Sequence, residues 1–184
     1  MDKNVVLDVK NLHVHYVTDD ATAKAVNGID FQVKEGEALG LVGETGAGKT
    51  TTALSIMQLI PDPPGIIVDG EIYFEGKNVI LNTDKENQAM RGNGVAMIFQ
   101  DPMTALNPVM TVGEQLSEVV IKQKKVSKAE AKKRALEIMR EVGIPMPEVR
   151  FRQYPFEFSG GMRQRIVIAI ALTATPDILI CDEP

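Results

Sequence analysis

The sequence predicts an α/β fold, and three observations support this prediction. The stretch GETGAGKT at residues 43–50 lies between a short apolar run and a helical pattern, which is a strand–loop–helix order. The apolar run ILIC at residues 178–181 precedes two acidic residues and is typical of a buried parallel strand. Residues 111–155 have a helical pattern, so strands and helices share one chain.

The first part of the chain predicts an antiparallel lobe, because short apolar segments alternate there with turn signals. Strands are expected at residues 5–9, 12–17, 25–33 and 72–74, with turns at residues 19–20, 35–36 and 69–70. We expect this lobe to lie beside the core that contains residues 43–50.

Residues 43–50 have the spacing of a phosphate loop: glycine, four residues, glycine, lysine and threonine. A buried strand is expected before this loop at residues 38–42 and a helix after it at residues 51–59. Prolines in residues 61–65 would end that helix. The flanking strand and helix are the context that the motif requires.

Each residue type in the loop has a physical role. Gly46 and Gly48 let backbone amides wrap a phosphate, and the helix N-terminus adds partial positive charge. Lys49 would bridge the β- and γ-phosphates of ATP, and the Thr50 hydroxyl would bind Mg²⁺. The predicted nucleotide-binding residues of this loop are Gly43, Thr45, Gly46, Ala47, Gly48, Lys49, Thr50 and Thr51.

The middle of the chain contains one more strand and then turns helical. Residues 95–99 predict a buried strand with Gln100 at its end. Ser127 and Glu130 have the spacing of a capping box, and Gly143 would stop the helix that they open.

A second candidate phosphate-binding segment is FSGGMRQR at residues 158–165. Ser159, Gly160 and Gly161 read as a helix N-cap whose backbone amides can approach an anion closely. A flexible cap before a buried helix is the alternative interpretation of the same residues.

The end of the chain brings carboxylates to the edge of a sheet. The strand at residues 178–181 would deliver Asp182 and Glu183 to its carboxyl end, where open α/β sheets bind ligands. Asp182 would hold Mg²⁺ and Glu183 would accept a proton from the attacking water. A strand that runs into an acidic surface turn is the alternative.

Composition excludes several classes of protein. The chain has 184 residues and a formal net charge of −5, which does not suit a basic nucleic-acid binder. Its single cysteine allows no intramolecular disulfide and no cysteine cluster for a metal. The longest apolar run is too short to cross a bilayer, and the N-terminus lacks the pattern of a secretory signal. We expect a soluble, cytoplasmic protein that reaches a membrane only through a partner.

The order of four motifs resembles that in the ATP-binding subunits of ABC transporters. These motifs are the phosphate loop, Gln100 after an apolar strand, SGGMRQR and ILICDEP. The stretch IFQDPMTALNP at residues 98–108 is similar to the version found in the branch that imports dipeptides and oligopeptides. Phe158 and Met162 depart from the general ABC pattern and are typical of that branch. The resemblance covers nearly the whole chain.

The resemblance implies a P-loop NTPase fold of the ABC type, with an antiparallel β lobe and a helical subdomain. It divides residues 1–184, as one incomplete nucleotide-binding domain, into a core with β lobe (about 1–100 and 156–184) and a helical subdomain (about 101–155). It also implies a transport-coupled ATPase that drives peptide import, peripheral to the cytoplasmic face of the cell membrane. The implied partners are transmembrane permease subunits, a second ATP-binding subunit and, indirectly, an extracytoplasmic solute-binding protein, with no nucleic acid.

Residue roles follow from the same resemblance. Tyr16 would stack on adenine, although it also suits a structural strand aromatic. Gln100 would sense Mg²⁺ and the attacking water. Ser159, Gly160 and Gly161 would grip the ATP held by the opposite subunit, while Lys49 and Glu183 would complete the catalytic set.

Members of the family continue beyond the acidic pair and carry a switch histidine, whereas the histidines here are His13 and His15. We therefore expect an apparently truncated chain that lacks the C-terminal part of the core and is impaired in hydrolysis. Two other functions stay open: a nucleotide-binding module without turnover, and a non-transport ABC ATPase. The latter usually has coiled-coil insertions or paired cassettes, which this chain lacks.

Overall fold

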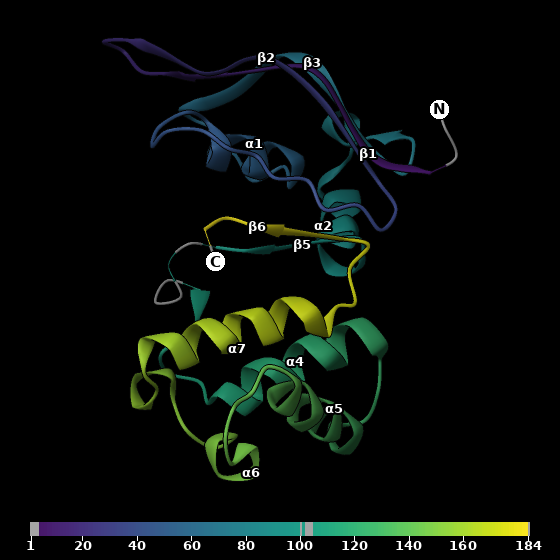
Figure 1. The fold of residues 1–184 in the computed structure, drawn as a ribbon, viewed down its shortest axis with the longest axis vertical. Coiled ribbons are helices and arrows are strands. Elements are labelled where there is room, and N and C mark those ends of the chain that lie inside the picture. Colours follow the sequence, from purple (N-terminus) through teal and green to yellow (C-terminus); the bar gives the residue numbers. More distant parts are fainter. Residues whose placement is uncertain (1–3, 100, 102–104, 184) are drawn as a thin grey trace. The chain divides into compact units, whose positions relative to one another are not determined.

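The computed structural model describes residues 4–99, 101 and 105–183. The chain divides into two compact units, Met1–Ala89 and Met90–Pro184. Each unit has its own sheet (Figure 1). Mixed strands and helices confirm the predicted α/β class.

The first unit is built on a four-stranded antiparallel sheet with the strand order β2-β1-β3-β4. Its strands are β1 (Val5–Val17), β2 (Thr22–Lys34), β3 (Gly65–Phe74) and β4 (Lys77–Asn78). Apolar residues of β1 and β3, such as Leu12 and Ile72, are fully buried. This sheet confirms the predicted antiparallel lobe.

Two details of that lobe differ from the prediction. The expected strands 5–9 and 12–17 are one strand, irregular near Asn11, whose φ is 44°. The expected turn at residues 69–70 lies inside β3, where Gly70 has a φ of 99°. A Cβ on Gly70 would lie 2.4 Å from the carbonyl oxygen of Asn11. The glycine therefore permits a close strand approach, and strand pairing continues across it.

The segment that leads into residues 43–50 also differs from the prediction. Residues 38–42 form no strand, and Val42 is 95% exposed. A strand needs a neighbour to satisfy its backbone donors and acceptors, and none of the strands described is paired with this segment. The helix after the loop is α1 (Lys49–Ile56), which starts two residues earlier and ends three residues earlier than expected.

A 3₁₀ turn η1 (Val79–Leu81) and the helix α2 (Asp84–Asn93) follow the first sheet, and the sequence prediction omitted both. The helix α2 spans the boundary between the two units.

The second unit combines a two-stranded parallel sheet with helices (Figure 1). Its elements are β5 (Val95–Ile98), α4 (Val112–Lys124), α5 (Lys128–Glu141), α6 (Pro147–Arg150), η2 (Pro155–Glu157), α7 (Gly160–Thr173) and β6 (Ile178–Cys181). The helix α7 lies between the β5–β6 pair on one side and α4 with α5 on the other. The parallel pairing of β5 with β6 confirms the predicted parallel strand.

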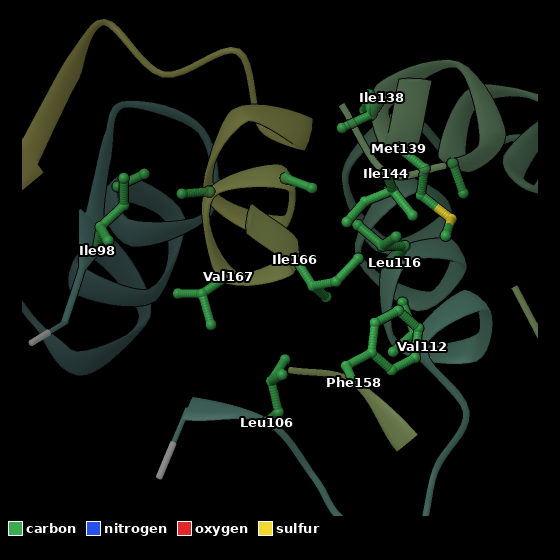
Figure 2. Close-up of a cluster of buried hydrophobic side chains, with 14 residues drawn as sticks. Ile98, Leu106, Val112, Leu116, Ile138, Met139, Ile144, Phe158, Ile166 and Val167 are labelled. Atoms are coloured by element: carbon green, nitrogen blue, oxygen red, sulfur yellow. The ribbon is translucent and has the colours of Figure 1, made fainter. Parts of the chain in front are cut away.

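The core of the second unit is formed around α7. Figure 2 shows Ile166 pointing toward Leu116 and Ile144, while Phe158 lies beside Val112. All of these side chains are buried. By contrast, β6 is only partly covered, because Leu179 is 38% exposed, so β6 is less buried than the sequence predicts.

Capping boxes start two helices of this unit. The Ser127 hydroxyl accepts from the Glu130 amide at 3.3 Å, as predicted. Thr111 and Glu114 make the same arrangement at the start of α4. Within residues 4–99, 101 and 105–183, none of the helices has the length and apolar content needed to cross a membrane.

Candidate functional site

The predicted phosphate loop leads directly into the N-terminus of α1. Gly46 and Gly48 both have a φ of 84°, a left-handed conformation that glycine adopts without strain. Gly48 is also required sterically, because a Cβ there would lie 2.3 Å from the carbonyl oxygen of Ala25. Residues 43–47 are exposed, and within them the Ala47 amide donates to the carbonyl oxygen of Glu44 at 3.1 Å.

Lys49 is held over this loop. Its Nζ donates to the carbonyl oxygens of Gly43 at 2.7 Å and Glu44 at 3.0 Å. The ammonium group is therefore held at the loop where the sequence predicts phosphates. Thr50 is exposed in the first turn of α1, and Thr51 is buried behind it.

Tyr16 lies close to the same helix. Its phenolic oxygen is 3.4 Å from Oγ1 of Thr51, and its ring is half-buried beside Gly65, where a Cβ would lie 2.9 Å from the ring carbon Cε1. The structure thus brings Tyr16 into contact with Thr51, one of the predicted nucleotide-binding residues, within the first unit.

Residues 159–161 form the first turn of α7 in the second unit. Ser159 is the N-cap residue, and its side chain makes no capping hydrogen bond. Gly160 and Gly161 are exposed, and a Cβ at either position would meet nothing within 4 Å. Nothing in the described chain fills the space above these two glycines, so their backbone is accessible to an approaching group.

The N-termini of α1 and α7 share a feature that the other helices lack. Among the described helices of eight residues or more, α2, α4 and α5 have acidic residues in the first turn, whereas α1 and α7 have none. Neither Gly48 nor Ser159 makes a side-chain cap. The N-terminus of a helix carries partial positive charge, which favours an anion.

The acidic pair follows β6 as predicted. The Asp182 amide donates to the carbonyl oxygen of Ile98 at 3.0 Å, which continues the pairing at the carboxyl ends of both strands. Asp182 is half-buried, and Glu183 is exposed with a φ of 49°. Gln100 would follow β5 at this edge, but it lies outside the described residues.

The comparisons with known proteins point to one family. The sequence profile described as "ABC transporter" matches residues 26–184. The chain belongs to the ABC transporter family. The resemblance inferred from the motifs is thereby confirmed.

Two similar proteins are named as peptide-transport ATP-binding proteins. The oligopeptide transport ATP-binding protein OppD of Bacillus subtilis (strain 168) is 54% identical over 97% of this chain and 50% of its own length. The dipeptide transport ATP-binding protein DppD of the same organism is 52% identical, over 97% of this chain and 53% of its own length. The chain therefore spans about half the length of these relatives.

Solved structures of ABC proteins share the fold. The ATP-binding cassette MJ0796, in a dimeric post-hydrolysis state bound to ADP and Pi, matches with a TM-score of 0.85 and 28% identity, over 96% of this chain and 73% of that chain. The protein cbiO1 of Clostridium perfringens, part of the transporter complex cbiONQ, matches with a TM-score of 0.77 and 29% identity, over 98% and 66%. The predicted ABC nucleotide-binding fold is confirmed.

Sequence reasoning missed contacts that support the ABC motifs. The side chains of Arg163 and Arg165 donate to backbone carbonyls before and beside α7, and no sequence pattern reveals such backbone partners. The Thr111–Glu114 box was detectable, because it has the same spacing as Ser127 and Glu130.

Proposed function

We propose that this chain is the nucleotide-binding part of a subunit that couples ATP hydrolysis to the import of peptides or related small solutes. The observation that carries the proposal is the pair of helix N-termini at Gly48 and Ser159, which have no side-chain cap and lie next to the exposed glycines Gly46, Gly160 and Gly161. Two relatives, 54% and 52% identical in sequence, are named as oligopeptide and dipeptide transport ATP-binding proteins. The division into core, β lobe and helical subdomain belongs to the same proposal.

At the first helix, the residues of the loop would hold the nucleotide. Backbone amides of residues 43–48 and the N-terminus of α1 would cradle the phosphates, and Lys49 would exchange its carbonyl partners for phosphate oxygens. Tyr16 would stack on adenine beside this helix. These contacts give binding and orientation, which are most of what phosphoryl transfer needs.

The donor set also suits Mg²⁺. No group of three or more His, Cys, Asp or Glu side chains within the described residues could hold a metal ion, but Mg²⁺ in nucleotide sites uses one or two protein oxygens together with phosphates. The Thr50 hydroxyl and the Asp182 carboxylate would supply those oxygens, and Gln100 would act beside them. The ion would neutralise charge on the phosphates. Glu183 would accept the proton of the attacking water.

At the second helix, Ser159, Gly160 and Gly161 would contact ATP bound by another subunit. Their backbone is open and the Ser159 side chain makes no capping bond, so hydrolysis would require a dimer. We propose a homo- or heterodimer of ATP-binding subunits on transmembrane permease subunits at the cytoplasmic face of the membrane. A solute-binding protein outside the cytoplasm would deliver the solute.

The test uses the full-length protein and a fluorescent ATP analogue. Lys49→Ala should weaken binding at least about tenfold, since charge-assisted hydrogen bonds contribute ~1.5–3 kcal/mol. Glu183→Gln should keep binding but lose hydrolysis about 100-fold or more. Ser159→Arg should also keep binding and lose hydrolysis. Unchanged binding in Lys49→Ala, or full hydrolysis in Ser159→Arg, would contradict the proposal.

A further inference from the structure

The side chain of Arg163 joins α7 to the segment that precedes it. Its Nε donates to the carbonyl oxygen of Pro155 at 2.7 Å, and its Nη2 donates to that of Phe156 at 3.2 Å. Both acceptors belong to the 3₁₀ turn η2. One guanidinium therefore fixes two successive peptide groups of that turn, with the planar donor geometry that arginine provides.

The backbone of Arg163 is bonded to the other end of the segment that starts at η2 and ends at Ser159. Its amide donates to the carbonyl oxygen of Ser159 at 2.9 Å, the first hydrogen bond of α7. Between η2 and Ser159 lies only Phe158, which is 4% exposed and packed in the core. Residues 155–159 are thus held at both ends by Arg163, and the buried side chain of Phe158 anchors the residue directly before Ser159.

In this arrangement, the Ser159 side chain makes no capping hydrogen bond to its own helix. The hydroxyl of an N-cap serine normally accepts a hydrogen bond from a backbone amide in the first turn of its own helix. Such a bond would turn the hydroxyl toward the helix. Arg163 fixes the peptide of Ser159 and the approach to it without using the hydroxyl. The hydroxyl is left available to a ligand.

Arg165 offers a comparison within the same helix. Its Nη1 donates to the carbonyl oxygens of Gly143 at 2.8 Å and Val142 at 3.4 Å. These acceptors follow the end of α5, and a Cβ on Gly143 would lie 2.7 Å from that nitrogen. Arg165 therefore stabilises the contact between α7 and α5, but it does not touch residues 155–159.

We propose that Arg163 is a positioning residue, whose side chain sets the orientation of Ser159 and of the two glycines toward the ATP of the partner subunit. The inference rests on the proposed function, because only a dimer would bring that ATP to Ser159. Arg163 itself would not contact the nucleotide bound by its own chain.

The experiment measures ATP-dependent dimerisation of the full-length protein by sedimentation, in a Glu183→Gln background that binds ATP without hydrolysing it. Affinity for the fluorescent ATP analogue is measured in parallel on the folded fraction. Arg163→Gln should weaken the dimer at least about tenfold, the value of one charge-assisted hydrogen bond, and change analogue binding by less than about twofold. Arg163→Lys should recover part of the dimer affinity, since an ammonium can reach one of the two carbonyls.

Arg165→Gln is the matched control, because it removes hydrogen bonds of the same kind from the same helix. It should lower the melting temperature while dimer affinity stays within about twofold of the parent. Parent-like dimerisation of Arg163→Gln, or equal weakening by Arg165→Gln, would overturn the inference. Should Arg163→Gln fail to fold, Arg163→Lys decides alone: weaker dimerisation with unchanged analogue binding supports the inference, and parent-like dimerisation overturns it.

Failure of the proposed function gives a different result. A parent protein that stays monomeric with ATP, or a Ser159→Arg protein that dimerises normally, would remove both proposals. Weakening by Ser159→Arg without weakening by Arg163→Gln would remove only the role of Arg163.

Discussion

The phenolic oxygen of Tyr16 lies 3.4 Å from the side-chain oxygen of Thr51, so a strand aromatic of the β lobe is tied to the helix that follows the phosphate loop. The two residues are 35 positions apart in the chain. The contact fixes the ring near the loop in which Lys49 is held.

Replacing Tyr16 separates stacking from hydrogen bonding. Tyr16→Phe should keep affinity for an ATP analogue within about threefold, whereas Tyr16→Ala should weaken it about tenfold, because stacking of a base on an aromatic ring contributes ~1–3 kcal/mol. Titration of the fluorescent analogue measures both. If Tyr16 is only a strand aromatic, Tyr16→Ala will lower the melting temperature and leave the affinity of the folded protein unchanged.

The two left-handed glycines of the phosphate loop should respond differently to alanine. Gly46→Ala should lower the free energy of unfolding by ~1–2 kcal/mol through backbone strain alone, because a Cβ there meets nothing within 4 Å. Gly48→Ala should add a clash with the Ala25 carbonyl, about 1–3 kcal/mol more. Urea unfolding measures both changes, and equal costs would contradict this account.

A third prediction concerns the packing of α4. A Cβ on Gly113 would lie 2.3 Å from a ring carbon of Phe151, so Gly113→Ala should destabilise the protein by ~1–3 kcal/mol. Adding Phe151→Leu should recover part of that loss, because the smaller side chain makes room. A double-mutant cycle in urea measures the coupling, and additive losses would show that the two residues do not compete for space.

Glu86 makes the free energy of unfolding depend on pH in the acidic range. Hydrogen bonds from Lys77 and from the backbone and side chain of Thr83 lower the pKa of its carboxyl from 4.5 to about 2. A carboxylate with a lowered pKa stabilises the fold above its unfolded pKa, and this contribution is lost as the pH falls from about 4.5 to about 2. Glu86→Gln should therefore flatten acid unfolding in that range. An NMR titration that gives the Glu86 carboxyl a pKa near 4.5 would contradict the prediction.

Local patterns were sufficient where the chemistry is local. The spacing of Ser127 and Glu130 predicted the start of α5, and the glycines of residues 43–50 predicted the loop before α1. The apolar run before Asp182 predicted β6 and its parallel pairing. In these cases, neighbouring residues supply the caps, the turn conformations or the apolar face.

Prediction failed where distant partners decide the structure. Residues 38–42 are apolar but unpaired with any described strand, and Gly70 looked like a turn because the carbonyl of Asn11 opposite it was unknown. The hydrogen bonds of Arg163 depend on how η2 folds back onto α7. No sequence spacing encodes these contacts.

The empty space above Gly160 and Gly161 has a consequence for engineering. Glycine is among the poorest helix formers, and alanine at an accommodating helical position stabilises by about 0.5–1 kcal/mol. A screen for heat resistance alone would therefore favour alanine at both positions, since no described atom of the chain would resist it. Under the proposed function those more durable proteins would be inactive, and thermal tolerance would be a misleading guide to fitness at this turn.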